Sequence, residues 1–141
     1  DACRLFGTML YSAFCGLSQE EILFGEPFPP EFEIELTPKI QAIADGSYRN
    51  KGEAKIAGSG YVVASLEAAL WCFWHTDNYR DAVLKAGNLG DDADTTAAVC
   101  GQIAGAFYGV EGIPPEWLEK VAMRQEITEL ADRLFQFDKS G

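Results

Sequence analysis

The chain has 141 residues, enough for one domain with a substantial buried core. Its hydrophobic content of 48% and mean hydropathy of -0.07 are typical of a soluble globular protein. A net charge of -11 argues against nucleic-acid backbones and anionic membrane surfaces as partners. We expect no membrane span and no secretory signal, because no apolar run approaches roughly 20 residues and the first residues lack a basic flank and a cleavage pattern.

The hydrophobic periodicity predicts an all-α fold, a compact multi-helix bundle in which residues 1–141 form a single domain. The expected helices, in chain order, cover residues 2–14, a short segment after Ser18, and residues 38–44, 61–74, 78–86, 95–108, 114–123 and 125–137. The helix at 61–74 is apolar nearly all round and is predicted to be the central buried helix.

Capping residues predict several of the helix ends. Ser18 and Glu21 have the spacing of a capping box, and Pro38 suits the first position of a helix. Asp77 is predicted to cap the helix at 78–86, which then ends at Gly87. Residues 45–59 are predicted to form a glycine-rich polar loop.

The cysteines and tryptophans are predicted to be structural. None of the cysteines forms a CxxC pair or another ligand-spaced pair, and small buried side chains are expected rather than disulfides. A cytoplasmic location follows from that expectation. The residues read as structural are Cys3, Cys15, Cys72 and Cys100, the core anchors Trp71, Trp74 and Trp117, His75 at a helix end, and Gly101, Gly105 and Gly109, whose spacing indicates close helix packing.

Residues 87–99, GNLGDDADTTAAV, place a carboxylate cluster between a glycine-rich turn and a helix of small residues. Hard divalent cations prefer such oxygens on a rigid frame. Asp92 and Asp94 would diverge by about 200° inside a helix, so they can share a cation only at the helix entry, together with the Thr95 hydroxyl. Helix capping alone is the alternative, since aspartates suit the positive end of a helix dipole. An EF-hand is excluded, because neither the required Gly nor the closing Glu is present.

A second candidate site is the turn formed by Gly58, Ser59, Gly60 and Tyr61. Glycines at a helix start let backbone amides approach a phosphate, and the neighbouring aromatic ring can stack on a base or a ribose. The alternative is a flexible loop that ends in a core tyrosine.

Four blocks in order resemble the carboxy-terminal half of the ADP-ribosylglycohydrolases. They are GYVV at 60–63, LEAALW at 66–71, GDDADTTA at 90–97, and residues 101–109 followed by Ile113, Pro114 and Trp117. The resemblance is dense over residues 56–121 and looser over residues 1–23. The resemblance implies that this chain adopts the family's all-α bundle and that the amino-terminal half of that bundle is missing from it.

The resemblance also implies a site and an activity. By position, Asp92, Asp94 and Thr95 are implied ligands of a pair of magnesium or manganese ions, and Asp91 is expected behind them or facing solvent. The loop with Ser59, Gly60 and Tyr61 is implied to border the ADP-ribose pocket. The implied activity is hydrolytic removal of ADP-ribose from modified protein side chains, with arginine as the first expected acceptor. No residue is assigned a catalytic role.

The implied metal site is incomplete in this sequence. Family members supply its other half from an early acidic residue and a Thr-Asp-Asp run near the amino terminus, and this chain has no such run. Two carboxylates and one hydroxyl fall short of roughly six oxygens, so weak cation binding is expected. The chain opens without Met inside a helical pattern, which predicts a fragment, a processed product or a truncated homologue.

Three hypotheses about function follow from these expectations. The first is a hydrolase acting on ADP-ribosylated protein or ADP-ribose, inactive as an isolated chain. The second is a non-catalytic helical remnant or partner-binding module that retains the fold. The third is a split enzyme whose amino-terminal half arrives from another chain. A homodimer is also expected, because a half fold should expose apolar surface.

Overall fold

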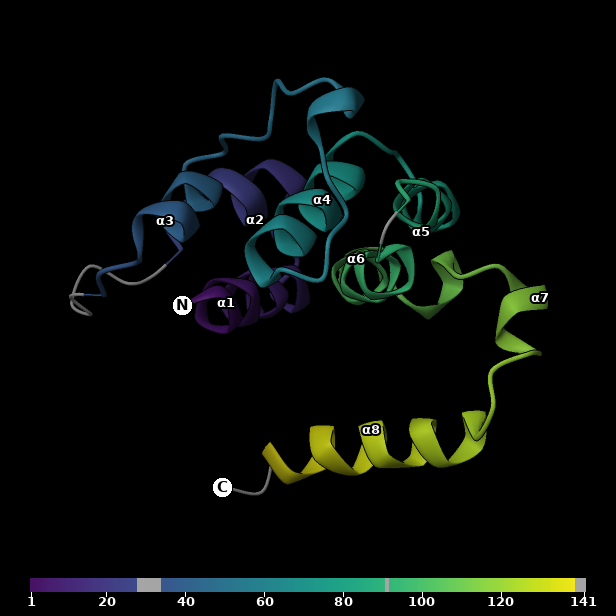
Figure 1. Ribbon diagram of the computed structural model, residues 1–141. Helices are drawn as coiled ribbons and strands as arrows, with labels where there is room; N and C mark the ends of the chain where they lie inside the picture. Colours follow the sequence, from purple (N-terminus) through teal and green to yellow (C-terminus); the bar gives the residue numbers. More distant parts are fainter. Residues whose placement is uncertain (28–33, 91, 139–141) are drawn as a thin grey trace.

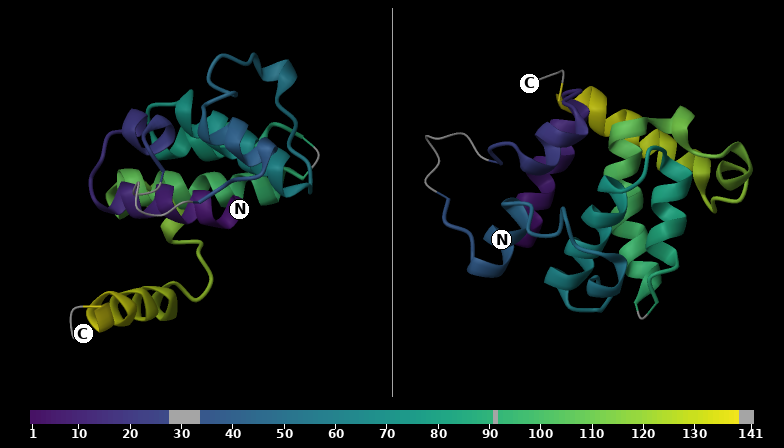
Figure 2. Two further views of the ribbon diagram at one scale, coloured as in Figure 1. Left: turned by 90° about the vertical axis from the view of Figure 1, so that its left-hand side faces the viewer. Right: turned by 90° about the horizontal axis from the view of Figure 1, so that it is seen from above.

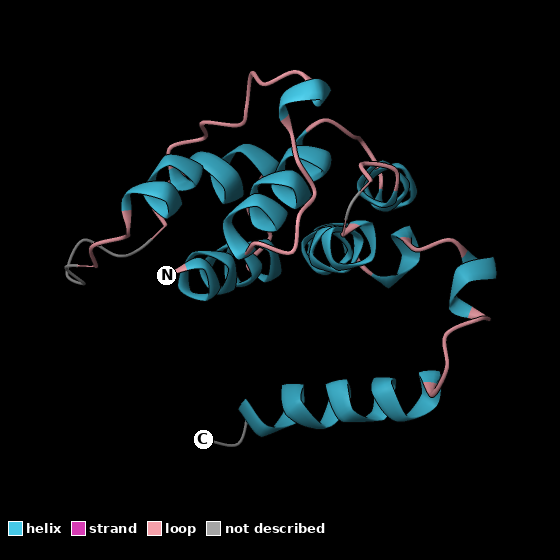
Figure 3. Cartoon of the chain, viewed as in Figure 1, coloured by secondary structure: helices cyan, strands magenta, loops and turns pink. Residues whose placement is uncertain are grey.

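The structure is a computed structural model that describes residues 1–27, 34–90 and 92–138. These residues form helices and loops and no strand, as Figure 3 shows, which confirms the predicted all-α class. The helices are α1 (Ala2–Phe14), α2 (Gln19–Phe24), α3 (Pro38–Ala44), α4 (Val62–Trp74), α5 (Tyr79–Gly87), α6 (Ala93–Tyr108), α7 (Pro115–Leu118) and α8 (Arg124–Asp138), with short 3-10 turns η1 (Glu53–Lys55) and η2 (Val110–Gly112). In these described ranges, no helix has the length and apolar character needed to cross a bilayer.

Helix α6 organises the body of the molecule. It packs most extensively against α5 and α4, and it also lies beside α1 (Figure 1). Helix α2 packs on α1, and α3 contacts both α1 and α4. The last long helix, α8, lies apart from this body on the side of α1 and α6, as the side view in Figure 2 shows.

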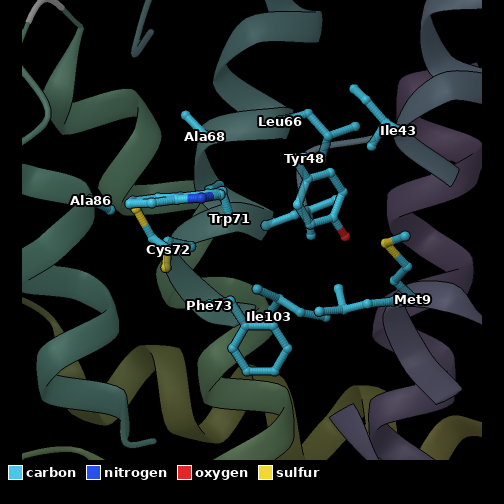
Figure 4. Packing of buried hydrophobic residues seen from close by; sticks show 14 of the residues in the cluster. Met9, Ile43, Tyr48, Leu66, Ala68, Trp71, Cys72, Phe73, Ala86 and Ile103 are labelled. Atoms are coloured by element: carbon cyan, nitrogen blue, oxygen red, sulfur yellow. The ribbon is translucent and has the colours of Figure 1, made fainter. Parts of the chain in front are cut away.

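Helix α4 is the central buried helix, as predicted. Leu70, Cys72 and Phe73 have no exposed surface and lie in one hydrophobic cluster with residues of α1, α3, α5 and α6 (Figure 4). Two hydrogen bonds tie the helix to distant segments: Trp71 Nε1 donates to the Lys51 carbonyl at 2.8 Å, and Gln19 Nε2 donates to the Phe73 carbonyl at 2.8 Å. The helix that precedes the candidate site is therefore fixed at several points along its length.

Two glycines of α6 lie at its contact with α5. A Cβ atom at Gly101 would lie 3.4 Å from the Tyr79 hydroxyl, and one at Gly105 would lie 3.7 Å from the Tyr79 ring. Both glycines therefore lie at a helix contact, as predicted, but a Cβ atom at either position would be in ordinary van der Waals contact with Tyr79 and alanine would fit. Gly109 instead follows the last residue of α6 with φ of +74°, a conformation in which a side chain would be strained.

The start of α5 was predicted with the wrong capping residue. Asn78, not Asp77, is the N-cap, and its side-chain oxygen accepts a hydrogen bond from the Asp81 backbone amide at 2.8 Å. The helix accordingly begins at Tyr79. The capping box of Ser18 is confirmed at the start of α2.

Two other segments also differ from the prediction. The expected helix at 114–123 is only the four-residue α7, because residues 119–123 are exposed and have no packing surface to support a longer helix. The expected polar loop at 45–59 contains η1 and contributes Tyr48 and Ile56 to the core. Burial raises the pKa of the Tyr48 hydroxyl.

All four cysteines are free, as expected, but only two are buried. Cys72 and Cys100 lie in the core, whereas Cys3 and Cys15 are exposed, so the prediction of buried side chains is wrong for the latter pair. Burial raises the pKa of the Cys72 thiol to about 12, and it raises the pKa of Cys100 as well. Both core thiols therefore remain protonated and pack as small apolar side chains. His75 ends α4, as predicted.

Candidate functional site

Asp92 stands at the entry of α6. It is the N-cap residue, and its carbonyl accepts a hydrogen bond from the Thr96 amide at 3.1 Å. Its carboxylate makes no cap bond to a backbone amide. Instead, Asp92 Oδ1 accepts a hydrogen bond from the Thr95 hydroxyl at 2.9 Å. The carboxylate therefore does not cap the backbone amides at the start of the helix.

Helix α6 begins at Ala93, two residues earlier than predicted, which changes the position of the second aspartate. Asp94 lies inside the first helical turn and is exposed, while Asp92 is half-buried. The structure thus brings Asp92 and Thr95 together and leaves Asp94 on the adjacent surface. Asp91 lies outside the described residues.

The loop before α4 lies against this entry. The Asp92 amide donates a hydrogen bond to the Gly58 carbonyl at 3.2 Å. A Cβ atom at Gly60 would lie 3.3 Å from Asp92 Oδ2. The segment predicted to bind substrate and the segment predicted to bind metal are therefore neighbours in space, although about thirty residues separate them in the sequence.

Tyr61 is the N-cap residue of α4 and is not a core tyrosine. Its exposed fraction is 53%, and the Lys39 ammonium lies 5.2 Å from its ring centroid, within cation–π range. Its backbone amide donates to the Ser59 hydroxyl at 3.3 Å. The ring is therefore accessible to a planar ligand. The alternative, in which Tyr61 is a core side chain, is wrong.

A cavity of about 410 Å³ opens beside Tyr61, between α3 and α4. Its volume falls in the range of small-molecule pockets. Lys39 and Lys51 line it, and Lys51 Nζ lies 2.6 Å from the Glu67 carboxylate. Neither lysine was predicted from the sequence, because no local motif marks them. Lys39 of α3 and Lys51 of the following loop reach this cavity only through the tertiary packing against α4.

The oxygen atoms at the entry of α6 are of the type that binds a hard divalent cation, but there are too few of them to fill its coordination sphere. The carboxylate of Asp92 and the hydroxyl of Thr95 are ligand types that magnesium and manganese prefer. Across residues 1–27, 34–90 and 92–138, no three histidine, cysteine or acidic side chains converge as a metal cluster, and the ion pairs formed there do not include Asp92 or Asp94. These residues suit one side of a cation site, and further oxygens must complete it.

The contact between the two segments predicts a steric requirement at Gly58. A Cβ atom there would lie 3.2 Å from both the Gly90 carbonyl oxygen and the Thr96 hydroxyl. We expect Gly58→Ala to lower the free energy of unfolding by about 1–3 kcal/mol, as overpacking does. Urea denaturation checks this value. Gly52→Ala is the matched control, because its Cβ would meet nothing within 4 Å and its φ of -73° suits alanine. Equal effects of the two substitutions would contradict the steric argument.

Comparison with known proteins identifies related chains. The family model described as ADP-ribosylglycohydrolase matches residues 1–140. The ADP-ribosylarginine hydrolase Tri1 of Pseudomonas putida is 47% identical over 135 residues, which cover 96% of this chain and 35% of that protein. The ADP-ribosyl-[dinitrogen reductase] glycohydrolase of Rhodospirillum rubrum is 41% identical over 68 residues, which cover 48% of this chain and 23% of that protein.

A solved structure agrees with these matches. The protein titled ADP-ribosylglycohydrolase-related protein complex superimposes with a TM-score of 0.80 at 36% sequence identity. The superposition covers 92% of this chain and 44% of that chain. The chain therefore spans about a third of the length of the Tri1 proteins that it matches.

Proposed function

The chain belongs to the ADP-ribosylglycohydrolase family, and from this premise we propose that it forms the carboxy-terminal part of a hydrolase that removes ADP-ribose from modified protein side chains. Arginine is the acceptor that we propose, since the Tri1 relatives of Pseudomonas putida and Serratia proteamaculans are named ADP-ribosylarginine hydrolases. Both relatives match nearly all of this chain, at 47% and 42% identity.

One observation carries the proposal: the carboxylate of Asp92 lies against the Gly58–Gly60 loop. The hydrogen bond from the Asp92 amide to the Gly58 carbonyl and the close approach of Gly60 to the carboxylate bring the two segments side by side, which supports the proposal. One segment supplies hard oxygens, and the other supplies a glycine-rich backbone and an exposed ring. A nucleotide and a divalent cation could both be held at such a junction.

We assign the following roles to these residues. Asp92, Asp94 and Thr95 contribute oxygens to magnesium or manganese, which when bound would stabilise negative charge on the ligand and orient a hydroxyl or water. Tyr61 offers its exposed face for stacking on the adenine or ribose. Ser59 and Gly60 let the backbone approach the ligand closely. Glycosidic cleavage has a transition state resembling an oxocarbenium ion, which nearby carboxylates stabilise.

We propose that catalysis requires oxygens from outside these 141 residues. The donors at the entry of α6 fall short of the roughly six that either cation prefers. The test is release of ADP-ribose from a protein carrying ADP-ribosylated arginine. We expect no release with the chain alone. Release is expected after addition of the part of the Pseudomonas putida Tri1 relative that lies outside the matched 135 residues. No release in the presence of a folded complex would contradict the proposed hydrolysis.

The second candidate function is a non-catalytic helical module that retains the fold and binds a partner. It is favoured by the exposed apolar side chains of α8, among them Leu130 and Leu134, which suit a surface for a protein partner. The same assay separates the two candidates, because a non-catalytic module would form the complex without release of ADP-ribose.

A further inference from the structure

The cavity of about 410 Å³ between α3 and α4 carries a positive charge that has no role so far. Lys39 of α3 and Lys51 of the following loop both line it. Lys51 Nζ lies 2.6 Å from the carboxylate of Glu67, which also lines the cavity, so these two charges compensate each other. The ion pairs formed within residues 1–27, 34–90 and 92–138 do not include Lys39. Among the described residues, Lys39 therefore gives the cavity one ammonium group that is not paired with a carboxylate.

The contact of Lys39 with Tyr61 joins this charge to an exposed aromatic ring. The ammonium lies 5.2 Å from the ring centroid, and Tyr61 is 53% exposed. Much of the remaining wall is apolar, with Ala42, Ile43 and Val63 among the lining residues. A planar ring that carries an anionic group matches this wall, because the ring can stack on the tyrosine while the anion contacts the ammonium.

The cavity adjoins the candidate cation site through two consecutive residues. A Cβ atom at Gly60 would lie 3.3 Å from Asp92 Oδ2, and the next residue, Tyr61, lines the cavity. A ligand bound at both places would pass over Tyr61, from the acids at the entry of α6 to the ammonium of Lys39. ADP-ribose suits such a path, because its diphosphate group separates the adenosine from the terminal ribose.

The chain as a whole repels an anionic ligand, since its net charge is -11. Attraction for phosphate groups must therefore come from a positive group in direct contact with them. A lysine ammonium has three donors and is a common partner of phosphate oxygens. Lys39 is such a group, and it lies beside the ring that the proposed function assigns to nucleotide stacking.

We propose that the cavity between α3 and α4 is the subsite for the phosphate groups of a nucleotide whose ring stacks on Tyr61, and that Lys39 binds those groups. This subsite deepens the proposed function and rests on it for the identity of the nucleotide, ADP-ribose. Lys39 is then a specificity-determining residue, because it favours a phosphorylated nucleotide over an uncharged nucleoside.

Calorimetric titration of the 141-residue chain with ADP-ribose, ADP and adenosine tests the subsite. A chelator is present throughout, so that the cation site at the entry of α6 does not contribute. Lys39→Gln should weaken binding of ADP-ribose and ADP about tenfold, the usual effect of losing one hydrogen bond to a charged group. Adenosine carries no phosphate, so its affinity should stay nearly unchanged. Lys39→Arg should restore most of the lost affinity, because a guanidinium also binds phosphate.

Lys120→Gln is the matched control. It removes the same charge from an exposed residue that follows α7, and Figure 1 places α7 at the opposite end of the body from α3. This variant should leave all three affinities nearly unchanged. Tyr61→Ala should instead weaken adenosine and ADP alike, about tenfold, because it removes the ring on which the base stacks. Unchanged adenosine affinity in Tyr61→Ala would overturn the placement of the ring, and with it the subsite.

Absence of ADP binding by the unchanged chain would also overturn the subsite. Equal losses for ADP and adenosine in Lys39→Gln would do so too, because Lys39 would then only hold the Tyr61 ring. A loss that Lys120→Gln reproduces would reveal an effect of net charge alone. Hydrolysis does not enter these titrations. An inactive complex with Lys39-dependent ADP binding would therefore count against the proposed function, whereas hydrolysis with unchanged ADP affinity in Lys39→Gln would count against the subsite.

Discussion

Replacement of Asp92 and Asp94 together by alanine is expected to abolish binding of magnesium or manganese to this chain. The two carboxylates supply the negative charge at the entry of α6, and the Thr95 hydroxyl alone cannot hold a divalent cation against water. Binding to the unchanged chain should itself be weak, since water must fill most of the coordination sphere. Titration with manganese followed by calorimetry measures both affinities.

The fold should survive this double substitution. The Asp92 carboxylate makes no hydrogen bond to a backbone amide, and Asp94 is exposed, so the loss is limited to the exposed hydrogen bond from the Thr95 hydroxyl and the favourable interaction of acids with the helix dipole. That loss is about 1 kcal/mol. Asp77→Ala with Asp132→Ala removes the same charge from exposed positions elsewhere and should leave manganese affinity unchanged. Unchanged affinity in the variant lacking Asp92 and Asp94 would refute the assignment of these residues as ligands.

Local sequence signals predicted most helices closely. The bounds of α1 and α3 agree with the prediction. Their signals, the apolar spacing of α1 and the proline at the start of α3, depend only on residues within one or two helical turns. The choice between Asp77 and Asn78 as the cap of α5 could not be made from sequence. Both residue types cap helices well, and only the backbone path selects Asn78.

Residues 115–138 show why a sequence rich in helix-forming residues does not by itself predict where a helix ends. Residues 119–123 have good helix formers, yet α7 ends at Leu118 and Met123 adopts a φ of 55°, in the left-handed region. A short helix without a buried face gains too little to offset its ordering cost. This segment therefore forms two helices, α7 and α8, and no glycine or proline lies between them to predict the interruption.

The two segments of the candidate site were predicted from the sequence, but the contacts between them were not. The motif around Asp92 and the turn before α4 were each recognised, and the resemblance implied that both serve one ligand. Their contact through Gly58 and Gly60 depends on how α4 packs on α6, which local patterns do not encode. The same holds for Lys39, which reaches Tyr61 only because α3 packs beside α4.

Phe73→Ala is expected to lower the free energy of unfolding by about 3–5 kcal/mol, the usual cost of emptying a buried phenylalanine site. Phe73 has no exposed surface, and its ring meets the Phe107 and Tyr108 rings edge-on at centroid distances of 5.5 and 6.2 Å. The substitution would thus loosen α4 from α6, the pair that positions the candidate site. Because a domain of this size is stable by only about 5–15 kcal/mol, a large fraction of that stability would be lost.

Phe14→Ala is the matched control for this prediction, because it removes the same atoms from a side chain that is 75% exposed. Its effect should stay within about 0.5 kcal/mol in the isolated chain. Urea denaturation of both variants measures the difference. A loss below about 1 kcal/mol for Phe73→Ala would mean that α4 and α6 can collapse around the vacated volume. The junction of the Gly58–Gly60 loop with Asp92 would then depend on the loop contacts themselves and not on the packing beneath them.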